Sequence, residues 1–111
     1  MNNKDTKLIA IDLDGTTLHS DGRSVSAYTK YIFKQLEAKG HLICITTGRP
    51  YRMSLAIYQA LELTSPMINF NGALISNPTN KHWGHTKAHY ITRSFVFELL
   101  RHQQNFDLEY F

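Results

Sequence analysis

The fold is decided by the stretch Leu8-Ile9-Ala10-Ile11-Asp12-Leu13-Asp14-Gly15-Thr16-Thr17, an apolar segment that turns acidic and then breaks. A near-continuous apolar run is typical of a strand buried on both faces of a parallel sheet. Gly15 follows the second carboxylate and marks a turn. Residues two apart on a regular strand point to the same face, so we expect Asp12 and Asp14 side by side at the end of this strand.

Predicted helices and short apolar strands alternate along the next part of the chain. Helical patterns cover residues 26–39 and 50–61, and strand patterns cover residues 41–46, 67–70 and 73–76. Ser26 is a preferred helix N-cap, and Gly40 stands where a left-handed C-terminal residue is preferred. Pro50 is expected in the first turn of the second helix. The alternation predicts an α/β fold, a doubly wound, Rossmann-like parallel sheet with right-handed crossovers.

Polar residues close each of the three predicted parallel strands: Asp12 and Asp14, then Thr46 and Thr47, then Asn71 and Gly72. Ligands of doubly wound sheets bind beyond the carboxyl ends of the strands, so we expect these residues at one site. Two neighbouring carboxylates repel each other unless a cation neutralises them, and Mg²⁺ prefers such oxygen ligands. The residues alone leave open a second interpretation, a solvated acidic turn before Gly15.

Composition excludes several classes of protein. The 111 residues carry 12 Lys+Arg and 9 Asp+Glu, and the basic residues are scattered, so we expect no nucleic-acid partner. The single cysteine, Cys44, excludes an internal disulfide framework and a Cys-rich zinc site. No apolar segment reaches the ~18–20 residues that span a bilayer, and the polar start lacks a signal-peptide core. We therefore expect a cytoplasmic protein without a membrane partner.

Three motifs resemble those of a known family. Residues 12–18, Asp-Leu-Asp-Gly-Thr-Thr-Leu, resemble motif I of the haloacid dehalogenase (HAD) superfamily. Residues 45–50, Ile-Thr-Thr-Gly-Arg-Pro, resemble motif II of its Cof-like, type IIB branch. Asn71-Gly72-Ala73 is similar to the Asn-Gly-Ala segment of that branch. The motifs occur in order, each at the end of a predicted strand, so the chain is identified as a member of this superfamily.

The resemblance implies the chemistry of the two carboxylates. Asp12 matches the nucleophile that attacks phosphorus and forms an aspartyl-phosphate. Asp14 matches the general acid and base that protonates the leaving oxygen and later activates water. Mg²⁺ is held in the family by the carboxylate that matches Asp12 and the backbone carbonyl that matches Asp14. The implied activity is a Mg²⁺-dependent phosphatase of small phosphorylated metabolites such as sugar phosphates; the alternatives are a phosphotransferase with the same chemistry or a non-catalytic binding fragment.

Further residues match phosphate-binding or substrate-binding positions. The phosphate-binding residues implied by the resemblance are Leu13, Thr47 and Gly48. The candidates for substrate contacts are Thr46, Arg49, Asn71 and Gly72. Structural alternatives stay open for these candidates: Thr46 as a β-branched strand residue, Arg49 as a brace for its loop, and Asn71-Gly72 as a turn.

Two segments with different roles are expected along the chain. Residues 1–80 resemble the N-terminal half of the HAD core, and residues 81–111 the beginning of its cap. Seven of the 13 aromatic residues fall in the second segment, where the pattern predicts a helix at 91–105 and a strand at 106–111. The family's motif III lysine and motif IV acidic cluster have no counterpart, so we expect a truncated chain that carries half of the active site and is inactive alone.

Three histidines, His82, His85 and His89, precede the predicted helix at 91–105. His85 and His89 would share one face if this segment were helical. Because Gly84 interrupts the segment, we expect surface or cap-lining histidines rather than a transition-metal site.

Overall fold

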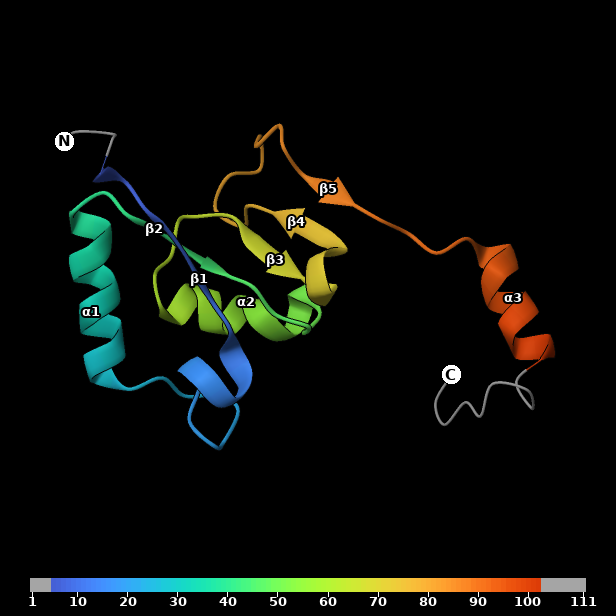
Figure 1. The fold of residues 1–111 in the computed structure, drawn as a ribbon, viewed down its shortest axis with the longest axis horizontal. Coiled ribbons are helices and arrows are strands. Elements are labelled where there is room, and N and C mark those ends of the chain that lie inside the picture. Colours follow the sequence, from blue (N-terminus) through green and yellow to red (C-terminus); the bar gives the residue numbers. More distant parts are fainter. Residues whose placement is uncertain (1–4, 103–111) are drawn as a thin grey trace.

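The structure is a computed structural model that describes residues 5–102, and its sheet has a parallel and an antiparallel part. β1 (Leu8–Ile11) pairs in parallel with β2 (Leu42–Ile45). A parallel bridge from Thr46 to Ile68 links β2 to β3 (Met67–Asn69). β4 (Leu74–Ser76) pairs antiparallel with β3 on one side and β5 (Lys87–Ala88) on the other. The strands therefore follow one another in chain order across the molecule (Figure 1).

Two helices connect the parallel strands. α1 (Ala27–Ala38) lies between β1 and β2 in the chain, and α2 (Tyr51–Ala60) lies between β2 and β3. The Ser26 hydroxyl accepts the Thr29 N–H at 3.0 Å, and Gly40 has a φ of +90° just beyond α1. Both features confirm the predicted limits of this helix, and the order of elements confirms the predicted α/β alternation.

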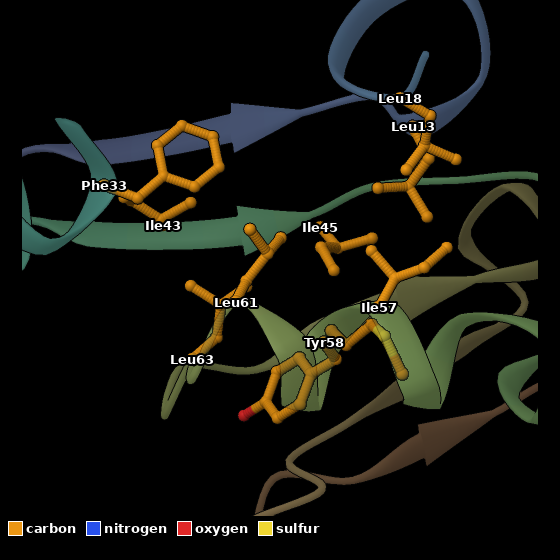
Figure 2. Packing of buried hydrophobic residues seen from close by; sticks show 10 residues of the cluster. Leu13, Leu18, Phe33, Ile43, Ile45, Ile57, Tyr58, Leu61 and Leu63 are labelled. Atoms are coloured by element: carbon orange, nitrogen blue, oxygen red, sulfur yellow. The ribbon is translucent and has the colours of Figure 1, made fainter. Parts of the chain in front are cut away.

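A single apolar cluster joins the sheet to both helices. Ile43 and Ile45 of β2 are completely buried and belong to one cluster with Phe33 of α1 and with Ile57 and Tyr58 of α2 (Figure 2). The first residues of β1 and β2 are exposed, Leu8 to 68% and Leu42 to 45%, whereas the rest of β2 is buried. Burial of each large aliphatic side chain contributes about 1.5–3 kcal/mol, so this cluster holds the strand ends in place.

The first strand is shorter than predicted. β1 ends at Ile11, and Leu13–Thr17 forms a wide turn that the Leu18 N–H closes on the Leu13 carbonyl at 2.9 Å. Gly15 has a φ of +75° inside this turn. The Leu13 side chain is completely buried, and neither Asp12 nor Asp14 belongs to β1. The prediction that Asp12 and Asp14 project from one strand is therefore wrong.

The prediction for Pro50 is wrong, and the structure contains a short strand, β5, that was not predicted. Pro50 has an extended ψ of 155° and precedes α2 instead of lying in its first turn. The histidine segment is not helical: it forms turns and then β5, and the His89 N–H donates to the Ala73 carbonyl at 2.8 Å. His85 and His89 therefore share no helix face. β5 itself was not predicted, because two residues are too short to show a strand pattern.

The last described helix is α3 (Arg93–Arg101), which begins after the N-cap Thr92. It starts two residues later than the predicted helix at 91–105, because the Thr92 hydroxyl accepts the Phe95 N–H at 3.3 Å and defines the first turn. An extended segment separates α3 from β5 (Figure 1). The predicted strand at 106–111 lies outside the described residues. Within residues 5–102, no helix has both the length and the apolar character needed to cross a membrane.

Candidate active site

Asp12 is the first residue beyond β1. Its backbone is still extended, with a ψ of 155°, and its side chain is exposed at the end of the strand. Asp12 Oδ1 accepts the Leu13 N–H at 2.9 Å, and Oδ2 lies 3.5 Å from the Thr16 hydroxyl. One carboxylate oxygen is thus oriented by the backbone, while the other has a single long contact among the described residues.

Asp14 has a partner of its own, Arg49. The Arg49 Nε–H donates to Asp14 Oδ2 at 2.7 Å, and Nη2 donates to Oδ1 at 2.5 Å. These charge-assisted hydrogen bonds hold the pKa of the Asp14 carboxyl below its usual value. The sequence predicts that a cation neutralises the two adjacent carboxylates. In the structure, the Arg49 guanidinium neutralises the charge of Asp14.

The same guanidinium joins two further segments to the site. Arg49 Nη2 also donates to the Gly22 carbonyl at 2.8 Å, and Nη1 donates to the Met53 carbonyl at 3.4 Å. The Arg49 side chain is only 17% exposed, whereas that of Asp14 is 58% exposed. Of the two predicted roles for Arg49, the structure shows the brace, which ties Asp14, the loop around Gly22 and the start of α2 together.

The loop after β2 is held against the end of β3 by backbone hydrogen bonds. The Thr47 N–H donates to the Ile68 carbonyl at 3.0 Å, and the Asn71 N–H donates to the Thr47 carbonyl at 3.1 Å. The buried Thr47 hydroxyl accepts the Arg49 N–H at 3.1 Å. Because an accepted hydrogen bond leaves the hydroxyl hydrogen available, Thr47 can still donate to an anion.

Gly48 and Asn71 are in direct contact. A Cβ at Gly48 would lie 2.9 Å from Asn71 Oδ1, so the amide of Asn71 occupies the space that any side chain at position 48 needs. Asn71 and Gly72 have φ values of 54° and 101°, the left-handed conformation that Asn and Gly tolerate best. Asn71 therefore makes the turn after β3 and also covers the Gly48 backbone, so its turn role is confirmed and its contact with a substrate stays a prediction.

The Thr46 hydroxyl and the Leu13 side chain are buried, which favours structural roles for both side chains over contacts with a ligand. The Thr46 N–H continues the parallel ladder to the Ile11 carbonyl at 2.8 Å, and its hydroxyl is buried without a partner among the described residues. This placement favours the strand role for Thr46. Leu13 has a completely buried side chain, so only its backbone can contribute to a phosphate site. Its N–H presently donates to Asp12.

The donor set suits a hard cation such as Mg²⁺. Asp12 offers a carboxylate oxygen whose hydrogen-bond contact among the described residues is a long one, 3.5 Å to the Thr16 hydroxyl. Mg²⁺ binds through one or two carboxylates and keeps several waters. Within residues 5–102, no three His, Cys, Asp or Glu side chains come together as a metal site. The described residues can therefore supply part of a magnesium site, which fits the chemistry of the ion.

Two buried side chains that hold the loop after β2, those of Asn69 and Ser54, are not among the site residues predicted from the sequence. Asn69 at the end of β3 is completely buried and donates to the Arg49 carbonyl at 3.0 Å and to the Ser54 hydroxyl at 3.0 Å. Ser54, in α2, donates in turn to the Pro50 carbonyl at 3.1 Å. A polar residue at the end of an apolar strand was the available signal for Asn69, and the adjacent Asn-Gly turn masked it.

Known proteins share both the sequence and the fold. The family model of haloacid dehalogenase-like hydrolases matches residues 9–111. A Bacillus subtilis protein named 5-amino-6-(5-phospho-D-ribitylamino)uracil phosphatase YitU is 49% identical over 77 residues, which are 69% of this chain and 28% of that protein. A putative phosphatase of Metamycoplasma hominis is 43% identical over 83 residues, covering 70% of this chain and 29% of its own. The chain thus spans less than a third of the length of these relatives.

Solved structures agree with the sequence comparison. A haloacid dehalogenase-like hydrolase from B. subtilis superposes with a TM-score of 0.70 at 30% identity, covering 92% of this chain and 34% of that structure. A HAD phosphatase from Bacteroides thetaiotaomicron shares the fold, with a TM-score of 0.74 at 24% identity over 92% of this chain and 36% of its own. The family that the three motifs predict is confirmed: the chain belongs to the haloacid dehalogenase-like hydrolases.

Proposed function

We propose that this chain supplies the nucleophile half of a Mg²⁺-dependent phosphatase that hydrolyses small phosphorylated metabolites. The observation that carries the proposal is the convergence of Asp12, the Thr47–Arg49 loop and Asn71 at the carboxyl ends of β1, β2 and β3, with Asp14 and Arg49 in contact. Ligands of parallel α/β sheets bind at this edge. The family membership supports the same reaction class.

Asp12 is the nucleophile in this proposal. Its hydrogen bond from the Leu13 N–H orients the carboxylate, and its less engaged Oδ2 attacks the phosphorus of the ester. The bond from phosphorus to the leaving oxygen breaks as the bond to Asp12 forms, which gives an aspartyl-phosphate. Asp14 supplies a proton to the leaving oxygen, so Arg49 must release the carboxylate enough for it to be protonated.

The second half of the reaction reverses the proton transfer. Asp14 takes a proton from water, the water oxygen attacks phosphorus, and the bond from phosphorus to Asp12 breaks to release inorganic phosphate. The Thr47 hydroxyl and the Gly48 backbone N–H donate to the phosphoryl oxygens, and the Leu13 N–H joins them once it leaves Asp12 Oδ1. Such donors stabilise developing charge, and losing one costs on the order of 3 kcal/mol in the transition state. The proposed ligands of Mg²⁺ are the Asp12 carboxylate and the Asp14 backbone carbonyl, and the ion supplies positive charge beside the phosphoryl group.

The proposed substrate class follows from the relatives. Two B. subtilis relatives, 49% and 38% identical, are named as phosphatases of 5-amino-6-(5-phospho-D-ribitylamino)uracil, a phosphomonoester on a polyol chain. We extend to this chain only the shared chemistry, a phosphomonoester of a small sugar-like molecule. We further propose that residues 1–80 form the first half of the core and residues 81–111 the beginning of a cap, in keeping with the extended segment that separates α3 from the sheet (Figure 1).

The proposal is tested in a hybrid protein, in which the matching residues of this chain replace the 77-residue segment of the B. subtilis relative. We expect the purified hybrid to release phosphate from a sugar phosphate only when Mg²⁺ is present. Asp12→Asn in the hybrid is expected to abolish release, while Glu62→Gln, a control at an exposed carboxylate that pairs with Lys34, retains it. A folded hybrid that is inactive, or that keeps its activity with Asp12→Asn, contradicts the proposal.

A further inference from the structure

Asn69 is a buried amide that the proposed chemistry does not use. Its side chain is completely buried at the end of β3, and its Oδ1 has no hydrogen-bond partner among the described residues. A buried polar atom without a partner destabilises the folded chain, whereas leucine has a similar volume and carries no such atom. Packing alone therefore does not account for an asparagine here.

The Nδ2 group of Asn69 does have partners, and both lie beside Arg49. It donates to the Arg49 carbonyl at 3.0 Å and to the Ser54 hydroxyl at 3.0 Å. Since a backbone carbonyl can only accept, this contact dictates which end of the amide faces the loop. The Ser54 hydroxyl donates onward to the Pro50 carbonyl at 3.1 Å, so one amide holds two consecutive carbonyls, directly and through Ser54.

These contacts complete a clamp on the backbone of Arg49. The Phe70 N–H donates to the same Arg49 carbonyl at 3.2 Å, and the Arg49 N–H is held by the Thr47 hydroxyl at 3.1 Å. Phe70 has a φ of 51°, a conformation that a bulky residue adopts only under strong local constraint. With its backbone held on both sides, Arg49 can direct its guanidinium at Asp14 and the Gly22 carbonyl.

We propose that Asn69 is a positioning residue: by holding the Arg49 carbonyl and Ser54, it sets the direction in which the Arg49 guanidinium leaves the loop. Through Arg49 it keeps Asp14 and the loop around Gly22 at the end of β1. Its importance for catalysis rests on the proposed function. The positioning itself is a property of this chain and is measurable without substrate, so its test and the hybrid phosphatase assay can fail independently.

The test compares Asn69→Leu, which keeps the volume and removes the donors, with wild type in the ¹⁵N-labelled chain. The signal is the Arg49 Nε–H, which donates to Asp14 in the wild type. We expect its exchange with solvent to become about tenfold faster, the equivalent of one lost hydrogen bond. The Nε–H of Arg101, whose guanidinium pairs with Glu98 on α3, is the internal reference and stays unchanged.

Asn77→Leu is the matched control, because Asn77 donates to the Thr64 carbonyl at 3.3 Å and has no contact with Arg49. It is expected to leave the Arg49 signal as in wild type. Asn69→Ala is the second variant if Asn69→Leu does not fold. The proposal is overturned if the Arg49 signal is unchanged in a folded Asn69 variant. It is equally overturned if neither variant folds, since Asn69 then serves the fold and not the loop.

Discussion

Arg49 pairs with Asp14 through two short hydrogen bonds, which leaves Asp12 as the carboxylate with an oxygen available for ligand chemistry. Asp12 and Asp14 therefore differ in their hydrogen-bond partners before any substrate binds, although they lie two positions apart in the sequence. Their environments distinguish them, because one is bound by a guanidinium and the other by a single backbone N–H. At the scale of residues, the hydrogen bonds thus give the two carboxylates, for which we propose different roles, different environments.

Replacing Arg49 tests this pairing. We expect Arg49→Met to lower the urea midpoint of unfolding and to release the loop around Gly22, because four acceptors lose their donor. Arg49→Lys is expected to recover part of the loss, since an ammonium cannot make the two parallel bonds. In about 1 M salt, where charges are screened within about 3 Å, the difference between wild type and Arg49→Met should shrink. An equal midpoint for all three proteins contradicts the pairing.

The contact between Gly48 and Asn71 predicts a coupling between two substitutions. Gly48→Ala is expected to destabilise the chain by about 1 kcal/mol, because the new Cβ meets Asn71 Oδ1 at 2.9 Å. Asn71→Gly removes that oxygen and tolerates the φ of 54°. In the double variant the cost of Gly48→Ala should therefore fall to near zero. A double-mutant cycle from urea denaturation measures the coupling, and additive effects rule out the steric explanation.

At the scale of elements, short turns as well as strands hold the residues of the candidate site in place. The turn at Asp21 is closed by its own carboxylate, which accepts the Ser24 hydroxyl at 2.6 Å, the Arg23 N–H at 2.8 Å and the Ser24 N–H at 2.9 Å. The His19 N–H closes the loop on the Ser24 carbonyl at 2.9 Å. This loop presents the Gly22 carbonyl to Arg49, so its shape matters to the site.

The Asp21 turn makes a prediction about pH. Hydrogen bonds from the Ser24 hydroxyl, the Ser24 N–H and the Arg23 N–H lower the pKa of Asp21 to about 2. Because the folded pKa is below the ordinary value of 3.8, the stabilisation is complete above that value and is lost as the pH falls through about 2. A carbon-13 titration should show this midpoint, and Ser24→Ala should raise it. A wild-type midpoint near 3.8 contradicts the turn geometry.

Tyr58 joins α2 to the segment before β3. Its hydroxyl is buried and donates to the Ser65 carbonyl at 2.6 Å. Tyr58→Phe keeps the ring and leaves this carbonyl without its donor, so we expect a loss of about 1 kcal/mol in the free energy of unfolding. Tyr28→Phe, at a position that is 72% exposed, is the control and should change stability by less than about 0.5 kcal/mol. Equal effects of the two substitutions contradict the assigned hydrogen bond.

At the scale of the whole molecule, the described residues form one side of a site. The parallel strands and their two crossover helices (Figure 1) position Asp12, the proposed nucleophile, and the loop Thr47–Arg49, the proposed phosphate-binding loop. Within residues 5–102, no three metal-binding side chains come together, and the sequence has no counterpart of the family's motif III lysine or motif IV acidic cluster. The apolar cluster is nevertheless built from both helices and from the parallel strands (Figure 2).

This arrangement predicts a folded chain without turnover. We expect the 111-residue chain to release no phosphate above background from an aryl phosphate in the presence of Mg²⁺. The physical reason is that Asp12 and Asp14 lack the further positive charge and metal ligands that the chemistry requires. A colorimetric phosphate assay measures the rate, with Asp12→Asn as the background control. Robust release that disappears in Asp12→Asn shows that the chain holds a complete site.

The sequence by itself determined the alternation of strands and helices, the Ser26 cap, the left-handed Gly40, the turn at Asn71 and the family. These features depend on side-chain periodicity and on hydrogen bonds between near neighbours, which a local pattern reveals. Only the tertiary structure decided that Arg49 binds Asp14, 35 residues away, and that the amide of Asn69 holds the Arg49 backbone. It also decided that β1 ends before Asp12 and that β5 joins the sheet. Such pairings depend on how buried segments such as Leu13 pack, and residues distant in the chain meet only after that packing is complete.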